Sequence, residues 1–161
     1  MTAQQTGIVI QRASRIAHIP DSRLFKKWLI TALAVVNKPT EMTLRIVNAA
    51  EARNLNSAFR GKDYATNVLT FVYHEKKSPL LMGDLVLCAQ VVVQEARAQK
   101  KSVRDHYAHL TVHGVLHLAG FDHEKPREAA AMEALEIEIL ATLGIGNPYD
   151  DTMAAGRSAL K

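Results

Sequence analysis

The pattern of apolar and polar positions changes near residue 89, from short runs typical of strands to longer stretches typical of helices. Before that point, apolar and β-branched residues gather in short runs, which predict three or four strands. These runs lie at residues 8–11, 43–47, 68–73 and 84–88. The spacing between them predicts a helix from Asp21 or Ser22 to about Asn37. It also predicts a short helix over 49–57, followed by a polar connection at 59–63.

Three further helices are predicted after residue 89, and the middle one is the most apolar. This helix begins at Ser102, whose hydroxyl can cap the first turn, and ends at Gly120. Nearly all residues of its second half other than histidine are apolar or small, so it is expected to be buried on most sides. The last helix runs from about Pro126 to Gly144. The predicted fold is α+β, with a small mixed four-stranded sheet and this buried helix at its centre.

The composition adds limits to this picture. With 161 residues, 48% of them hydrophobic, the chain is predicted to form a single domain over residues 1–150, followed by a flexible tail at 151–161. The lone cysteine, Cys88, lies in an apolar run and cannot form an internal disulfide, which indicates a reducing compartment. No segment is long and apolar enough for a membrane span or a signal peptide. A cytoplasmic protein without membrane association is therefore expected, and its net charge of +4 permits a polyanionic partner without requiring one.

Five of the seven histidines lie between residues 106 and 123, and three of them have a spacing that suits a metal ion. His113 and His117 are four residues apart on a predicted helix, so they project from nearly the same face. The bend at Gly120 allows His123 to reach the same point. Three neutral imidazole nitrogens would leave a coordination position open, as in catalytic zinc sites, although imidazoles also suit copper, iron and nickel. The alternative is a set of core histidines satisfied by hydrogen bonds.

The same H-x3-H-x5-H spacing occurs in the metzincin proteases, where a glutamate that acts as general base follows the first histidine. Here that position is Gly114. Without a carboxylate beside the water, peptide hydrolysis loses its proton acceptor, so a zinc peptidase is disfavoured. Hydrolysis of a phosphodiester requires instead that charge on the phosphoryl oxygens be neutralised, which a metal and an arginine can do together. Arg60 is a candidate for this arginine and joins His113 and His117 as a predicted catalytic residue, although a solvated loop cation or a partner in a surface ion pair is the alternative for it.

Several segments then match a known family, beginning with the stretch from His113 to His123. The others are residues 55–63, 66–71, 83–86, 132–133 and 143–144. Together they resemble the YbeY family of endoribonucleases and rRNA maturation factors, over roughly residues 40–146. The resemblance implies an α+β fold, one Zn²⁺ on His113, His117 and His123, and hydrolysis of single-stranded RNA. It also implies that Arg60 lines the metal cleft. The chain departs from the family's usual residues at three positions, where it has Asn67, Thr70 and Phe121.

The leading hypothesis is thus a metal-dependent, single-strand-specific endoribonuclease that acts in 16S rRNA 3′-end maturation and ribosome quality control. Small-subunit ribosomal proteins and an Era-like GTPase are further candidate partners. The alternative is a non-catalytic ribosome-assembly factor whose zinc is structural and whose basic surface binds rRNA. The roles of His109 and Asp122 stay open. So does the role of a basic run, which is either a solvated face or an RNA contact and consists of Arg97, Lys100, Lys101 and Arg104.

Overall fold

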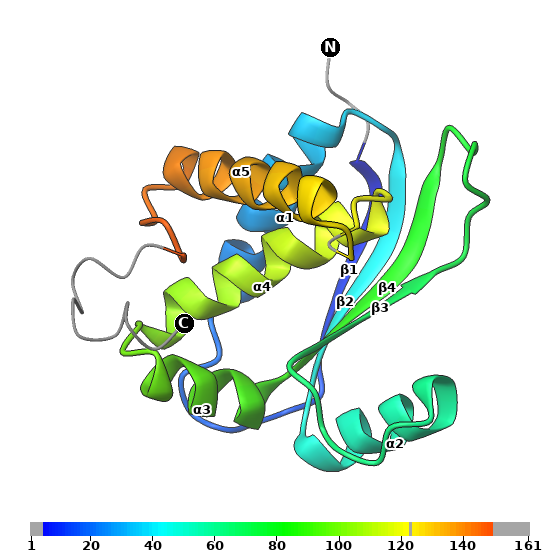
Figure 1. Cartoon of the computed structure of the whole chain (residues 1–161). Coiled ribbons are helices and arrows are strands. Elements are labelled where there is room, and N and C mark those ends of the chain that lie inside the picture. The colour runs from blue at the N-terminus through cyan, green and yellow to red at the C-terminus, as the bar shows by residue number, and fades with distance from the viewer. Residues whose placement is uncertain (1–4, 123, 150–161) are drawn as a thin grey trace.

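A computed structural model describes residues 5–122 and 124–149 of the chain (Figure 1). Within these residues, four strands and five helices form an α+β fold, as predicted. The elements in chain order are β1 (Gln5–Arg12), α1 (Ser22–Val36), β2 (Thr40–Val47), α2 (Ala49–Arg60), β3 (Val68–Val72), β4 (Leu81–Cys88), α3 (Ala89–Ala98), α4 (Val103–Leu118) and α5 (Pro126–Thr142). Residues 151–161, predicted to be a flexible tail, lie outside the described part, as does His123.

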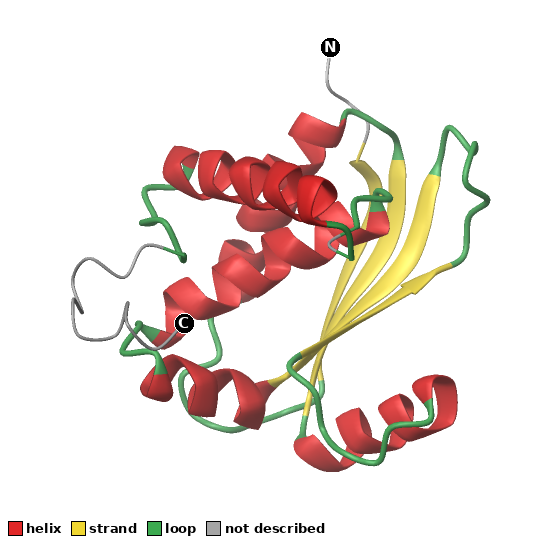
Figure 2. Ribbon diagram, viewed as in Figure 1, coloured by secondary structure: helices red, strands yellow, loops and turns green. Residues whose placement is uncertain are grey.

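The four strands form one mixed sheet in the order β1-β2-β4-β3. β1, β2 and β4 run parallel to one another, and β3 pairs antiparallel with β4 at one edge of the sheet. Figures 1 and 2 show α1, α4 and α5 gathered on one side of the sheet, whereas α2 lies apart from them at one end. The predicted small mixed four-stranded sheet is therefore confirmed, and β3 is one of its two edge strands.

Two hydrophobic clusters lie on the two faces of the sheet. On β4, Leu85 and Leu87 belong to the larger cluster with α1, α4 and α5, whereas Val86 and Cys88 belong to the smaller one beneath α2. The sequence of a strand that is covered on both faces is expected to be continuously apolar and not to alternate between apolar and polar residues. This explains the apolar run that surrounds Cys88, whose side chain is buried as predicted.

Most helix ends follow the predicted caps, but α2 extends further than expected. The side chain of Asp21 accepts a hydrogen bond from the amide of Arg23, and Ser102 accepts one from the amide of Asp105, at 2.8 and 3.0 Å. The helix predicted over 49–57 continues to Arg60 and ends at Gly61, whose φ of 70° is the left-handed conformation that favours glycine. Arg60 is therefore the last residue of a helix and not part of a loop. The polar composition of this segment concealed its helical end.

The central helix α4 packs very closely against the sheet. Ten of its sixteen residues are buried, which confirms the prediction that this helix lies in the core. At Gly114, a Cβ atom would lie 2.2 Å from Cδ1 of Leu85 on β4, so only glycine fits without displacing that leucine. A glutamate at this position, as in the metzincins, would therefore have to displace Leu85.

Candidate active site

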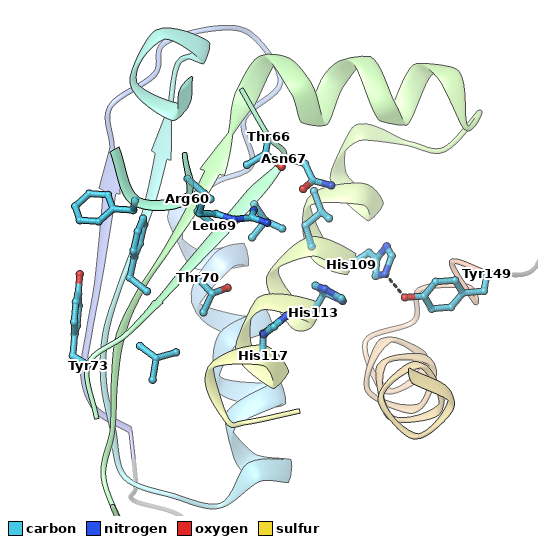
Figure 3. A pocket seen from close by; sticks show the side chains of 15 residues that line it. Arg60, Thr66, Asn67, Leu69, Thr70, Tyr73, His109, His113, His117 and Tyr149 are labelled. Carbon is cyan, nitrogen blue, oxygen red and sulfur yellow. Dashed lines mark hydrogen bonds between the residues drawn. The ribbon is translucent and has the colours of Figure 1, made fainter. Parts of the chain in front are cut away.

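The histidines of α4 form a stripe along one side of the helix. The rings of His113 and His117 have centroids 5.7 Å apart and are inclined at 68°, and the His109 ring lies 6.3 Å from that of His113. The four-residue spacing places the three rings one above another on successive turns. All three line a single cleft, in which they lie side by side (Figure 3). The predicted pair is therefore together on one face, accompanied by His109.

The cleft has a volume of about 900 Å³, and β3 with the segment before it forms the wall opposite α4. Arg60, at the end of α2, also lines it (Figure 3). Its side chain is exposed, and none of the described acidic residues forms an ion pair with it. An unpaired guanidinium in a cleft with imidazoles can accept an anionic group without first breaking a salt bridge. The structure thus brings Arg60, His113 and His117 to the same cleft.

A buried carboxylate lies behind the histidines. Glu136, from α5, is 0% exposed and accepts hydrogen bonds from Nδ1 of His113 and from the hydroxyl of Tyr149. Nε2 of His109 lies 3.2 Å from the Tyr149 hydroxyl and 3.5 Å from Oε1 of Glu136. Burial alone would raise the pKa of Glu136, but the hydrogen bonds from His109, His113 and Tyr149 outweigh it and hold this pKa at about 2. Glu136 is therefore ionised at neutral pH and acts only as an acceptor.

This carboxylate determines which ring nitrogen of His113 is available to a ligand. Because an ionised carboxylate can only accept, Nδ1 of His113 donates the proton of this hydrogen bond, which leaves Nε2 as the nitrogen that would bind a metal ion. A carboxylate behind a ligating histidine is the usual way in which metal sites fix the ring and strengthen it as a ligand. Burial lowers the pKa of His109, against the raising effect of Glu136, which favours the neutral form of that ring. This end of the cleft therefore combines imidazole nitrogens with a buried negative charge behind them, which fits a divalent cation.

Neither Glu136 nor Tyr149 was identified from the sequence. Glu136 follows Met132 by four residues and precedes Ile139 and Leu140, all of which are buried. A lone acidic residue on the apolar face of an amphipathic helix was the available signal, because a buried charge requires a partner. Tyr149 carried no comparable signal, since it lies seven residues beyond the end of α5.

A second network holds His106 away from the cleft. Its Nε2 lies 2.8 Å from Oε1 of Glu95, and the side-chain amide of Asn67 donates to the same carboxylate at 3.0 Å. His106 is 3% exposed and does not line the cleft, so it is not placed to act directly. Asn67 does line the cleft, and its amide satisfies Glu95 where an aspartate would repel it.

The structure describes some of the remaining candidate residues and not others. Because His123 lies outside the described residues, the predicted trio is not tested, and no group of three metal-binding side chains is found in the described part of the chain. The carboxylate of Asp122 accepts a hydrogen bond from the amide of Glu124 at 3.1 Å, as in an Asx turn. The basic run at 97–104 contributes no residue to the lining of the cleft.

Imidazoles on a buried helix, a carboxylate behind them and an arginine beside them are typical of metal-assisted hydrolases. The comparisons with known proteins give the family. The family model described as Endoribonuclease YbeY matches residues 10–144, and the chain belongs to this family.

Relatives and a solved structure agree with this assignment. An endoribonuclease YbeY of Aromatoleum aromaticum is 53% identical over 150 residues, covering 91% of this chain and 94% of that protein. One of Nitrosomonas europaea is 48% identical over 146 residues, covering 91% of this chain and 86% of that protein. The solution structure of a Thermotoga maritima protein covers 91% of this chain and 98% of its own, with a TM-score of 0.59 and 24% identity, which supports the fold. The resemblance seen in the sequence is thereby confirmed.

Proposed function

We propose that this protein is a metal-dependent endoribonuclease that hydrolyses single-stranded RNA, with one zinc ion held by His113, His117 and His123. One observation carries the proposal: two imidazoles on successive turns of α4 share a cleft with Arg60, and Glu136 orients the first of them. Membership of an endoribonuclease family supports RNA as the substrate. Three imidazole ligands suit zinc and leave a coordination position for the reaction.

The residues of the chain bind, orient and neutralise charge. A zinc ion bound there would polarise a phosphoryl oxygen and lower the pKa of water to about 7. Arg60 offers parallel N–H donors to the non-bridging oxygens of the scissile phosphate and neutralises the charge that develops on them. Glu136 holds the ring of His113 in place, and Tyr149 in turn donates to Glu136. Gly114 offers no carboxylate, which disfavours peptide hydrolysis.

We further propose that the substrate in the cell is the 3′ end of 16S rRNA, and that the protein acts in the cytoplasm in ribosome quality control. Small-subunit ribosomal proteins and an Era-like GTPase are its candidate partners. The resemblance of the sequence motifs to the family supports this role. None of the helices in the described part of the chain is both long and apolar enough to cross a membrane.

The proposal is tested by cleavage of a labelled single-stranded RNA by the purified wild-type chain. We expect cutting in the presence of zinc, loss of cutting after treatment with a chelator, and recovery when zinc is restored. A duplex of the same sequence and an unstructured peptide are expected to stay intact. Binding of RNA without cutting, with or without zinc, would instead support the assembly factor whose metal is structural. Cleavage of the peptide would support the peptidase.

Glu136→Gln is expected to weaken metal binding by about 10- to 100-fold, because the neutral amide no longer fixes His113 as a strong ligand. Glutamine has nearly the same shape as glutamate, so the buried site can remain filled. The measurement is zinc affinity by competition with a fluorescent chelator, and Glu138→Gln, at an exposed position of the same helix, is the matched control. Equal zinc affinity in the two variants would show that Glu136 does not support the metal site.

A further inference from the structure

Three aromatic side chains, Phe59, Phe71 and Tyr73, line the cleft on the side of α2 and β3, and we refer to them as the aromatic rim. Phe59 is 67% exposed and Tyr73 is 61% exposed, which is unusual for rings of this size. In Figure 3, Tyr73 lies across the histidines from Tyr149, at the other side of the cleft. The rim is thus a partly exposed apolar surface on the α2 side of β3, and it meets the histidine cleft at this edge of the sheet.

The rings of the rim are held in place. Phe59 and Phe71 make an edge-to-face contact with centroids 5.2 Å apart and planes at 73°. The hydroxyl of Tyr73 donates to Oδ2 of Asp84 at 2.8 Å, and its backbone amide donates to Met82 at 2.8 Å, beyond the end of β3. Phe71 also packs against the smaller hydrophobic cluster beneath α2. The rings are therefore ordered before any ligand arrives, which lowers the entropic cost of binding to them.

The rim is continuous with the charged part of the cleft. Phe59 immediately precedes Arg60, so an aromatic ring and an unpaired guanidinium lie at adjacent positions at the end of α2. A ligand that suits both features must combine flat apolar groups with negative charge. Unpaired nucleotides have this combination, since each carries a base with two π faces and a phosphate. The bases of a duplex are already stacked on one another and cannot offer these faces.

We propose that the aromatic rim is a base-stacking subsite, which binds unpaired bases of the RNA next to the phosphate held by Arg60. The inference rests on the proposed function, and it gives a physical reason for selectivity toward single strands. Stacking on aromatic side chains tolerates any base, so the subsite selects for strandedness and not for sequence.

The test compares two fluorescein-labelled strands of equal length, an unstructured oligoribonucleotide and one in which every base is replaced by an abasic residue. Both carry the same phosphates, but only the first can stack. Binding is measured by fluorescence anisotropy with a chelator present, so that the RNA is not cut. We expect the wild-type chain to bind the strand with bases more tightly.

The variant Phe59→Leu keeps an apolar side chain but removes the π face, and Phe59→Tyr keeps the ring as its matched control. Phe59→Leu is expected to bind the strand with bases about tenfold more weakly and the abasic strand unchanged. Phe59→Tyr should bind both strands as the wild type does. Because Phe59 is largely exposed, both variants are expected to fold, and their thermal unfolding temperatures check this. Val35→Ala, at an exposed apolar position of α1, tests for a general effect of lost apolar surface.

Equal affinities of Phe59→Leu and the wild type for the strand with bases would overturn the subsite. So would a loss that is the same for the abasic strand, because it would indicate an effect on phosphate binding alone. If the wild-type chain cuts single-stranded RNA and Phe59→Leu binds RNA as tightly as the wild type, the stacking subsite is contradicted and the proposed function is not. If the wild-type chain neither binds nor cuts RNA, both the subsite and the proposed function are contradicted.

Discussion

The His117→Ala variant is expected to lose its bound zinc and to cut single-stranded RNA at least about 10²-fold more slowly than the wild type. Metal ions contribute several kcal/mol of charge stabilisation in the transition state, and about 1.4 kcal/mol corresponds to a factor of ten in rate. His117 lies one turn after His113 and lines the cleft, but it takes no part in the bond to Glu136. Its removal should therefore open the metal site without disturbing the buried carboxylate. Elemental analysis and a gel-based cleavage assay measure the two losses.

The control for this variant is another histidine that lies outside the cleft. His18 is exposed, and its φ of 72° is tolerated by asparagine, so His18→Asn should keep both zinc and activity. Circular dichroism of both variants verifies that they are folded. A His117→Ala chain that holds zinc at wild-type stoichiometry would contradict the ligand assignment. One that loses zinc and still cuts RNA at the wild-type rate would contradict the metal-dependent mechanism.

The Arg60→Ala variant is expected to lose about 10²- to 10³-fold in kcat/KM for RNA cleavage while its zinc content stays unchanged. The guanidinium lines the cleft and makes no ion pair with described acidic residues, so its loss removes a contact to substrate and not a contact within the protein. Arg60→Lys should recover only part of the activity, because an ammonium group keeps the charge but not the parallel pair of donors. Steady-state kinetics on a labelled single strand, together with zinc analysis, provide the measurement.

Arg23→Ala is the matched control, since Arg23 is an exposed arginine of α1 that does not line the cleft. It removes the same charge from the chain as Arg60→Ala does. If both variants lose activity equally, the effect comes from overall charge, and Arg60 has no special place in the reaction. If Arg60→Ala loses zinc as well, its role is structural.

Much of the fold could be predicted from local patterns in the sequence. The caps at Asp21 and Ser102 and the stop of α4 near Gly120 depend on residues close together in the chain, and they were located correctly. The end of α2 was misplaced because helix propensity and polarity conflict there. Gly61, four residues beyond the predicted end, terminates the helix through its left-handed conformation.

The candidate site was predictable only where its residues share a helix. The four-residue spacing of His113 and His117 places them on one face of α4, and this follows from helix geometry alone. Glu136 reaches His113 from another helix, 23 residues further along the chain, and no local pattern indicates that contact. The place of Tyr149 depends on the path of the chain after α5. Contacts of this kind come from tertiary packing, which spacing rules do not describe.

The tight contact between Gly114 and Leu85 also bears on how this chain can change over time. Some glycine codons differ from a glutamate codon by a single base, so the substitution that would supply a protease-like general base lies within easy mutational reach. A side chain at position 114 would have to displace Leu85 from the interior, since even its first carbon atom would overlap that leucine. A mutation toward a peptidase at this position would therefore carry a cost to folding before any selection on activity could act.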